Sequence, residues 1–283
     1  MKKQNTKGYA FDYIILILVF IICIFPIIYT FLTSFKTNAE ILTHPDRLFP
    51  TAWSFENYKL AFTSDDFNVG KMLFNSSYYT LFCVCFAILS SSVCAYVFER
   101  GEFFGKKVIF TMFSSLMFIS LGSITVYPLF DILNIVHLNR SLWGLIAIKM
   151  LGIPIVNIYL VKSYIKTLPK ELDEAAMIDG CSFVGIFFKI IAPLLKPIVA
   201  TVAILSFQSS WNEYLMPTIF TLANPSQRTL MVGVVALKNS GNSAASWNLM
   251  LAGSMVALLP VLIAYTFFNR YFVSGLTAGA VKG

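Results

Sequence analysis

Six apolar stretches, each about as long as a membrane-spanning helix, constrain the fold of this chain more than any other feature. A helix rises about 1.5 Å per residue, so about 20 apolar residues cover the roughly 30 Å hydrocarbon core of a bilayer. The chain is 57% hydrophobic and 12% charged, whereas soluble domains carry about a quarter charged residues. We therefore predict an all-α, polytopic membrane protein with six transmembrane helices at residues 14–32, 72–98, 108–127, 142–165, 194–215 and 249–268.

Lysine and arginine are divided unevenly between the two sides of the predicted membrane. Thirteen lie in the segments on the side of the N-terminus, and six lie in the opposite loops. Because segments rich in lysine and arginine stay in the cytoplasm, we predict that both termini and the loop at residues 166–193 are cytoplasmic. The net charge of +7 suits anionic lipid headgroups better than nucleic acid, because the cations flank the spans.

The first apolar run has two interpretations. Lysines followed by an apolar run are also typical of a cleaved signal peptide. Residues 14–32 exceed the roughly 7–15 residues of a signal core, and a clean small-x-small cleavage site is missing. We predict an anchoring helix in which Pro26 is tolerated as a kink.

The polar loop between the fourth and fifth spans has the pattern of two short helices. Pro169 is placed to open the first helix, and Gly180 permits the left-handed conformation that ends it. Ser182 is placed to cap the second helix. Acidic residues near the start of the first helix suit its positive N-terminal end: Glu171, Asp173 and Glu174. An apolar stripe is predicted on the second: Phe183, Ile186, Phe187 and Ile190.

One side of the first helix is predicted to be small enough for another backbone to approach closely. Four residues fall at helical spacing on this side: Leu172, Ala175, Ala176 and Asp179. We interpret the loop as a helix–turn–helix on the membrane surface that a protein outside the bilayer grips. The other interpretation is a plain surface loop stabilised by lipid headgroups. A DNA-reading helix–turn–helix is implausible with a span on each side.

This loop resembles the EAA loop of permease subunits in ATP-binding-cassette (ABC) importers. The residues that carry the resemblance are Glu174, Ala175, Ala176, Gly180 and Pro193. Within the superfamily it is similar to the carbohydrate branch, as in the second permease subunit of the maltose transporter. Cys181 stands where Ala is usual, and Ala192 where Leu is usual. The resemblance runs from about residue 75 to the C-terminal FV-GLTAGAVKG pattern at residues 272–283.

The resemblance implies a permease subunit of an ATP-driven, binding-protein-dependent importer of a sugar or oligosaccharide in a bacterial cell membrane. Its partners would be a second, non-identical permease subunit, two cytoplasmic ATPase subunits and an extracytoplasmic sugar-binding protein. The chain itself would hold no cofactor, because ATP and Mg²⁺ would bind to the ATPase subunits. The parts would be a cytoplasmic N-terminus (1–13), a permease domain (14–268) with the coupling loop (166–193), and a cytoplasmic tail (269–283).

The resemblance also implies which residues act. ATPase coupling would use Glu174, Ala175, Ala176, Asp179 and Gly180. The tail alone has the composition of a disordered end, but by resemblance it reaches the ATPase interface, with Gly275 and Gly279 allowing close approach.

Two aromatic stretches have both a functional and an ordinary interpretation. Trp211, Asn212 and Glu213 resemble a segment of sugar permeases, which implies a substrate path. Alternatively, Trp211 and Tyr214 belong to an interfacial aromatic belt and Asn212 bonds a neighbouring helix. The aromatic residues at 53–58 either anchor the chain at the interface or contact a partner.

The sequence gives little support to other classes of function. No catalytic set and no metal site are predicted, because the two histidines and five cysteines show no ligand spacing. Residues 101–106 fall one residue short of a phosphate loop, so we predict a basic turn there. An ion-gradient-driven secondary transporter is the alternative, and it needs ionisable residues inside the membrane. Only Lys149 and Glu213 qualify, and neither has an obvious partner in the sequence.

Overall fold

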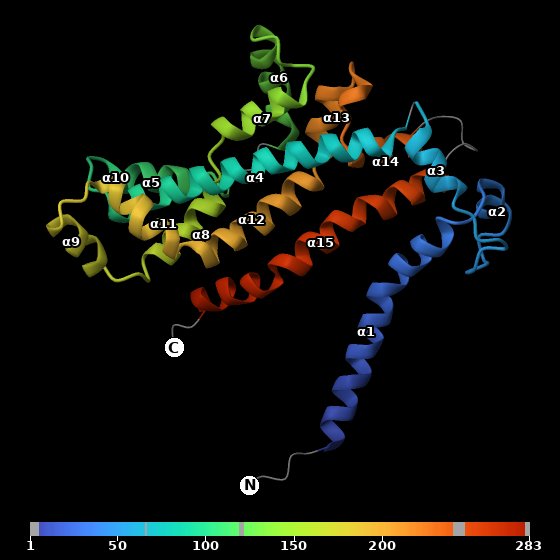
Figure 1. Ribbon diagram of the computed structural model, residues 1–283, viewed down its shortest axis with the longest axis horizontal. Helices are drawn as coiled ribbons and strands as arrows, with labels where there is room; N and C mark the ends of the chain where they lie inside the picture. Colours follow the sequence, from blue (N-terminus) through green and yellow to red (C-terminus); the bar gives the residue numbers. More distant parts are fainter. Residues whose placement is uncertain (1–5, 66, 119–121, 240–246, 281–283) are drawn as a thin grey trace. The chain divides into compact units, whose positions relative to one another are not determined.

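The chain is all-helical over the part that the structure describes. A computed structural model describes the backbone of residues 6–280 except 66, 119–121 and 240–246, and side chains within residues 12–267 except at these gaps and at 123, 238 and 239. No β-strand occurs in these ranges, and the helices follow one another as shown in Figure 1, which confirms the predicted fold class. The chain divides into two compact units, one of residues 1–70 and 233–259 and the other of residues 71–232 and 260–283.

The first unit begins with α1 (Thr6–Thr33), an apolar helix with almost no protein around it. None of the residues in its apolar 18-residue spanning window is buried within the chain, and burial begins only at Leu32 and Thr33, at the end of the helix. A helix that is hydrophobic on every side and unburied by protein suits lipid. Pro26 lies inside the helix, as predicted. Two short helices follow, α2 (Asn38–Thr43) and α3 (Glu56–Thr63).

The aromatic residues at 53–58 pack within this first unit. The buried ring of Phe35 lies 5.2 Å from the rings of Trp53 and Phe55 and 5.4 Å from that of Tyr58. The Asn57 amide donates to the carbonyls of Ser34 and Lys36 at 2.7 and 2.8 Å. These contacts hold residues 53–58 against the turn after α1, while Trp53 and Phe55 stay more than half exposed.

The second unit is built along α4 (Val69–Arg100), which carries two separate cores. Near its start, Tyr79 and Cys83 pack against α6 (Val126–Ile135), α7 (Leu142–Leu151) and α13 (Leu215–Thr221). Near its end, Ala95, Tyr96 and Phe98 pack against α8 (Ile155–Ile165) and α12 (Lys196–Trp211). One long helix therefore connects two regions far apart along its axis.

The predicted fourth span, residues 142–165, is a bent pair of helices, and the predicted fifth span, residues 194–215, corresponds to α12, which forms a second bent pair with the end of the preceding loop. Helices α7 and α8 meet at 42°, at the predicted interruption by Gly152 and Pro154. The second pair joins the stretch Phe183–Leu194 to α12 at 78°. That stretch comprises α10 (Phe183–Ile186), a π-helical turn (Phe187–Ile191) and α11 (Ala192–Leu194).

The predicted third span, residues 108–127, is wrong as a single helix. Helix α5 (Lys106–Ser115) ends early, and a 3₁₀ turn (Gly122–Thr125) leads into α6. Gly122 has φ +53°, a left-handed conformation that interrupts helix. Pro128 lies in the first turn of α6 rather than ending a span, because proline costs no hydrogen bond there.

The chain ends differently from the predicted polar tail. After α13 come a 3₁₀ turn (Pro225–Gln227) and α14 (Leu230–Asn239). Helix α15 (Trp247–Ala280) then continues past the expected end at residue 268, with Gly275 and Gly279 in its last turns. Over the described ranges, three helices are each long and apolar enough to cross a membrane, or up to five if each bent pair is one span.

Candidate functional site

The loop between α8 and α12 folds as the sequence predicts, around α9 (Glu171–Ile178). The helix begins at Glu171, so Pro169 precedes it instead of forming its predicted first residue, and Gly180 ends it in a left-handed conformation, with φ +80°. The Cys181 N–H donates to the Ala176 carbonyl at 2.9 Å, and the Gly180 N–H donates to the Met177 carbonyl at 3.0 Å. These two bonds form a Schellman motif. The Ser182 hydroxyl then accepts from the Gly185 N–H at 3.2 Å, which confirms the second cap.

One alanine of α9 lies on a different face of the helix from the one predicted. Glu174, Ala175 and Asp179 are exposed, but Ala176 is buried in the core of the chain's own second unit. It shares this inner face with Asp173, three residues earlier, which is buried and forms an ion pair. The prediction that Ala176 lies on the free side with Ala175 is therefore wrong.

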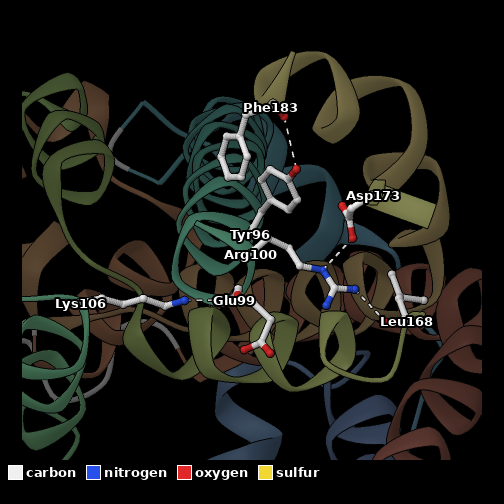
Figure 2. A network of polar contacts seen from close by, with 7 residues as sticks. All are labelled: Tyr96, Glu99, Arg100, Lys106, Leu168, Asp173 and Phe183. Carbon is white, nitrogen blue, oxygen red and sulfur yellow. Dashed lines mark hydrogen bonds and ion pairs between the residues drawn. The ribbon is translucent and has the colours of Figure 1, made fainter. Parts of the chain in front are cut away.

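An ion pair joins the inner face of α9 to the end of α4. Arg100 Nε lies 2.9 Å from Asp173 Oδ2, and both side chains are only 6% exposed. Arg100 also donates from Nη2 to the Leu168 carbonyl at 2.7 Å, so one guanidinium holds the chain on either side of the start of α9 (Figure 2). Removing one partner of a buried ion pair leaves an uncompensated charge, at a cost of about 3–5 kcal/mol.

Aromatic residues hold the other side of the Gly180 turn to the same helix. The ring of Tyr96 on α4 stacks on that of Phe183 with centroids 4.5 Å apart, and its hydroxyl donates to the Phe183 carbonyl at 3.3 Å (Figure 2). Phe187 adds a second ring contact to Tyr96 at 5.2 Å. Both short helices of the loop are therefore attached to the last turns of α4.

The last turns of α4 are themselves tied to α8 and α5. Glu99 forms an ion pair with Lys162 of α8 at 3.0 Å. The Lys106 ammonium at the start of α5 donates to the carbonyls of Glu99 and Gly101, at 3.3 and 2.8 Å. A force applied to α9 would therefore pass to α4, and through α4 to α8 and α5.

A second polar site lies nearer the other end of α4, in a cavity of about 540 Å³. Its polar lining includes Lys149 and Glu213, whose charged groups form an ion pair at 3.0 Å. The Tyr79 hydroxyl donates to the same carboxylate at 2.7 Å. The expectation that Lys149 and Glu213 lack partners is therefore wrong. Lys149 on α7 and Glu213, two residues after the end of α12, come together across 64 residues of sequence, which no local pattern signals.

The other two residues of the predicted substrate path do not line this cavity. Trp211 is buried and stacks on Phe207, with ring centroids 5.5 Å apart. The exposed Asn212 donates to the Gln208 carbonyl of its own helix at 3.0 Å, not to a neighbouring helix. Of the three predicted residues, the structure places only Glu213 at the cavity.

Comparison with known proteins identifies the class of this chain. Residues 70–277 match the protein family described as binding-protein-dependent transport system inner membrane component. The chain belongs to this family. It is a multi-pass membrane permease and not an enzyme.

Sequence similarity to known permeases covers nearly the whole length of this chain. It is 36% identical to a sulfoquinovosyl glycerol transport system permease protein of Agrobacterium fabrum, with 92% of this chain and 89% of the relative aligned. It is 35% identical to an arabinooligosaccharides transport system permease protein of Bacillus subtilis, with 92% and 91% aligned. A crystal structure of a bacterial ABC transporter involved in alginate import has a chain with the same fold, with TM-score 0.81, 22% identity, and 96% and 99% of the chains covered.

Sequence reasoning missed three residues that position the loop around α9. From the sequence alone, Arg100 is one of the cations that flank the spans, Asp173 is an acidic residue near a helix start, and Tyr96 is one residue of an apolar span. The one available signal was an arginine directly after an apolar run, where a snorkelling side chain is the ordinary interpretation. Its true partner lies 73 residues away.

Proposed function

We propose that this chain is a permease subunit of an ATP-driven importer of a sugar or oligosaccharide, with both termini in the cytoplasm. Relatives named for arabinooligosaccharide, galactooligosaccharide and sulfoquinovosyl glycerol transport support a carbohydrate substrate. None of these relatives is described as a gradient-driven carrier. The family supports partners in general: another permease, ATPases and a substrate-binding protein.

The finer assembly is part of the same proposal. A second, non-identical permease pairs with this one, and two cytoplasmic ATPases bind ATP and Mg²⁺. An extracytoplasmic binding protein delivers the sugar. The C-terminal turns around Gly275 and Gly279 contact the ATPases.

One observation carries the coupling mechanism: α9 has a free face and a fastened face. Glu174, Ala175 and Asp179 are exposed, and Ile178 is 87% exposed. On the opposite side Asp173 is ion-paired to the end of α4. An ATPase that grips the free face and moves on nucleotide binding therefore moves α4 with it. Rigid-body motion of packed helices then alternates the path between inward-open and outward-open states.

Reversal of one exposed charge tests the coupling. We expect Glu174→Lys to reach the membrane at normal level, because the side chain is exposed. Its ATP-driven sugar uptake in membrane vesicles should fall about tenfold or more, because a charge-assisted contact becomes a repulsion.

The matched control is Glu102→Lys, which makes the same charge change at an exposed residue of the turn between α4 and α5. It should transport like the unaltered chain. Normal uptake by Glu174→Lys would contradict the docking of α9 in the ATPase.

A further inference from the structure

The cavity beside α4 combines an apolar wall with a small group of polar side chains. Its polar lining consists of Lys149, Glu213, Asn157, Ser206, Ser209 and Ser210, and its other side chains are mostly aliphatic. Its volume of about 540 Å³ lies within the range of roughly 300–1,000 Å³ that is usual for ligand sites. Ionisable residues among membrane helices are costly and mark substrate pathways by default.

The charged pair is held in place and still has unused hydrogen-bonding capacity. The completely buried Tyr79 donates to Glu213 Oε2, the same oxygen that pairs with Lys149. An ammonium group has three donors, and a carboxylate has about four acceptor sites. The Lys149 side chain is 38% exposed and that of Glu213 is 17% exposed, so both remain accessible from the cavity.

We propose that the Lys149–Glu213 pair is a hydroxyl-binding site for an uncharged carbohydrate on the transport path. A sugar hydroxyl both donates and accepts, so neighbouring hydroxyls can accept from Lys149 and donate to Glu213 at once. This assignment rests on the proposed function and names the chemical class of its substrate.

Neutral sugars are favoured by the charge balance of the site. Glu213 lies 3.0 Å from Lys149 and compensates its charge. An acidic sugar would therefore gain little from the ammonium group and would meet the carboxylate of Glu213.

The lining also favours passage over tight binding. No aromatic side chain is among the cavity-lining residues in the part of the chain that the structure describes. Binding therefore rests on hydrogen bonds without ring stacking. Weak contact suits a step on a path, because conduction requires that the bound species leave again.

Protection of an introduced thiol tests the site directly. Ser209 is an exposed residue of the lining, and Ser209→Cys is a small change. The complete permease–ATPase complex carrying this variant is placed in lipid nanodiscs and alkylated with and without arabinotriose, and each thiol is quantified by mass spectrometry. Cys85 is exposed and outside the lining, so it serves as an internal reference.

We expect arabinotriose at twice its Kd to slow alkylation at position 209 about threefold and to leave Cys85 unchanged. Trigalacturonate at the same concentration should protect less. Lys149→Met or Glu213→Gln, each removing one charged partner, should weaken protection by arabinotriose about tenfold in Kd. Glu213→Gln should also improve protection by trigalacturonate, because Lys149 is then uncompensated. Gln208 is an exposed residue of α12 outside the lining. In the control variant Gln208→Ala, arabinotriose should protect the thiol at position 209 as well as in the Ser209→Cys protein.

Equal protection by the two sugars, or protection that does not depend on Lys149 and Glu213, would overturn the inference. Should a single variant fail to assemble, the double variant Lys149→Met/Glu213→Gln leaves no unpaired charge and gives the same test. The readout needs neither ATP nor uptake. If arabinotriose protects position 209 but Glu174→Lys transports normally, only the proposed coupling is contradicted. If Glu174→Lys loses uptake but arabinotriose does not protect position 209, only this binding site is contradicted.

Discussion

Single residues decide how the loop around α9 ends its first helix and how it is attached to α4. Gly180 has φ +80°, and a Cβ added there would meet no atom within 4 Å. The requirement for glycine is therefore conformational and not a matter of space. The left-handed region costs other residues about 1–2 kcal/mol, and asparagine tolerates it better than most.

We expect Gly180→Ala to loosen the end of α9 without changing the rest of the permease. Amide hydrogen exchange at Gly180 and Cys181, whose N–H groups form the Schellman bonds, should become about tenfold faster, because a strain of about 1.4 kcal/mol is a factor of ten in opening. Gly180→Asn is the matched control, and hydrogen exchange of the amides at positions 180 and 181 should be slower in it than in Gly180→Ala. Identical exchange in all three proteins would show that the turn carries no strain.

At the scale of the elements, the contact between α9 and α4 is the one on which the proposed coupling depends. Arg100 and Asp173 are both buried, and Asp173 Oδ1 has no hydrogen-bond partner among the described residues. Removal of one charge thus leaves the other without compensation.

A double-mutant cycle isolates this contact. Arg100→Met and Asp173→Asn should each destabilise the purified permease by about 3–5 kcal/mol, and the double variant by less than the sum of the two. Thermal unfolding gives the stabilities, and the ratio of sugar transported to ATP hydrolysed gives the coupling. Glu99→Gln/Lys162→Met removes the more exposed neighbouring pair and should cost less. Additive single effects would mean that the two groups do not interact.

Local signals predicted elements well and tertiary contacts poorly. Gly180 and Ser182 define the ends of short helices through their own backbone chemistry, so their roles were visible in the sequence. Gly152 and Pro154 likewise marked a bend that the structure confirms. The pairing of Lys149 with Glu213 depends on a partner 64 residues away, and the inward turn of Ala176 depends on how α9 packs against the core of the second unit. Hydropathy also could not show that Gly122 interrupts the third apolar run, because hydropathy carries no information about the backbone angle φ.

At the scale of the whole molecule, the spanning helices leave most of their surface free of this chain. The buried share of the spanning window is 33% for α4, 17% for α15 and zero for α1. Apolar surface of this extent needs lipid or another membrane protein to cover it. A chain that surrounds so little of its own helices is suited to share a transport path with a second permease.

The proposed orientation places α9 and the α13–α14 region on opposite sides of the membrane. Two exposed residues report on these sides without touching the candidate sites: Thr167, just before α9, and Ala223, just after α13. Each is changed to cysteine in turn, and intact cells are treated with a membrane-impermeant thiol reagent. Because the lysine- and arginine-rich segments stay in the cytoplasm, Ala223→Cys should be labelled in intact cells, and Thr167→Cys only after permeabilisation. The unaltered chain, with its own five cysteines, gives the background. Labelling of Thr167→Cys from outside would put α9 out of reach of any ATPase and would contradict the proposed mechanism as a whole.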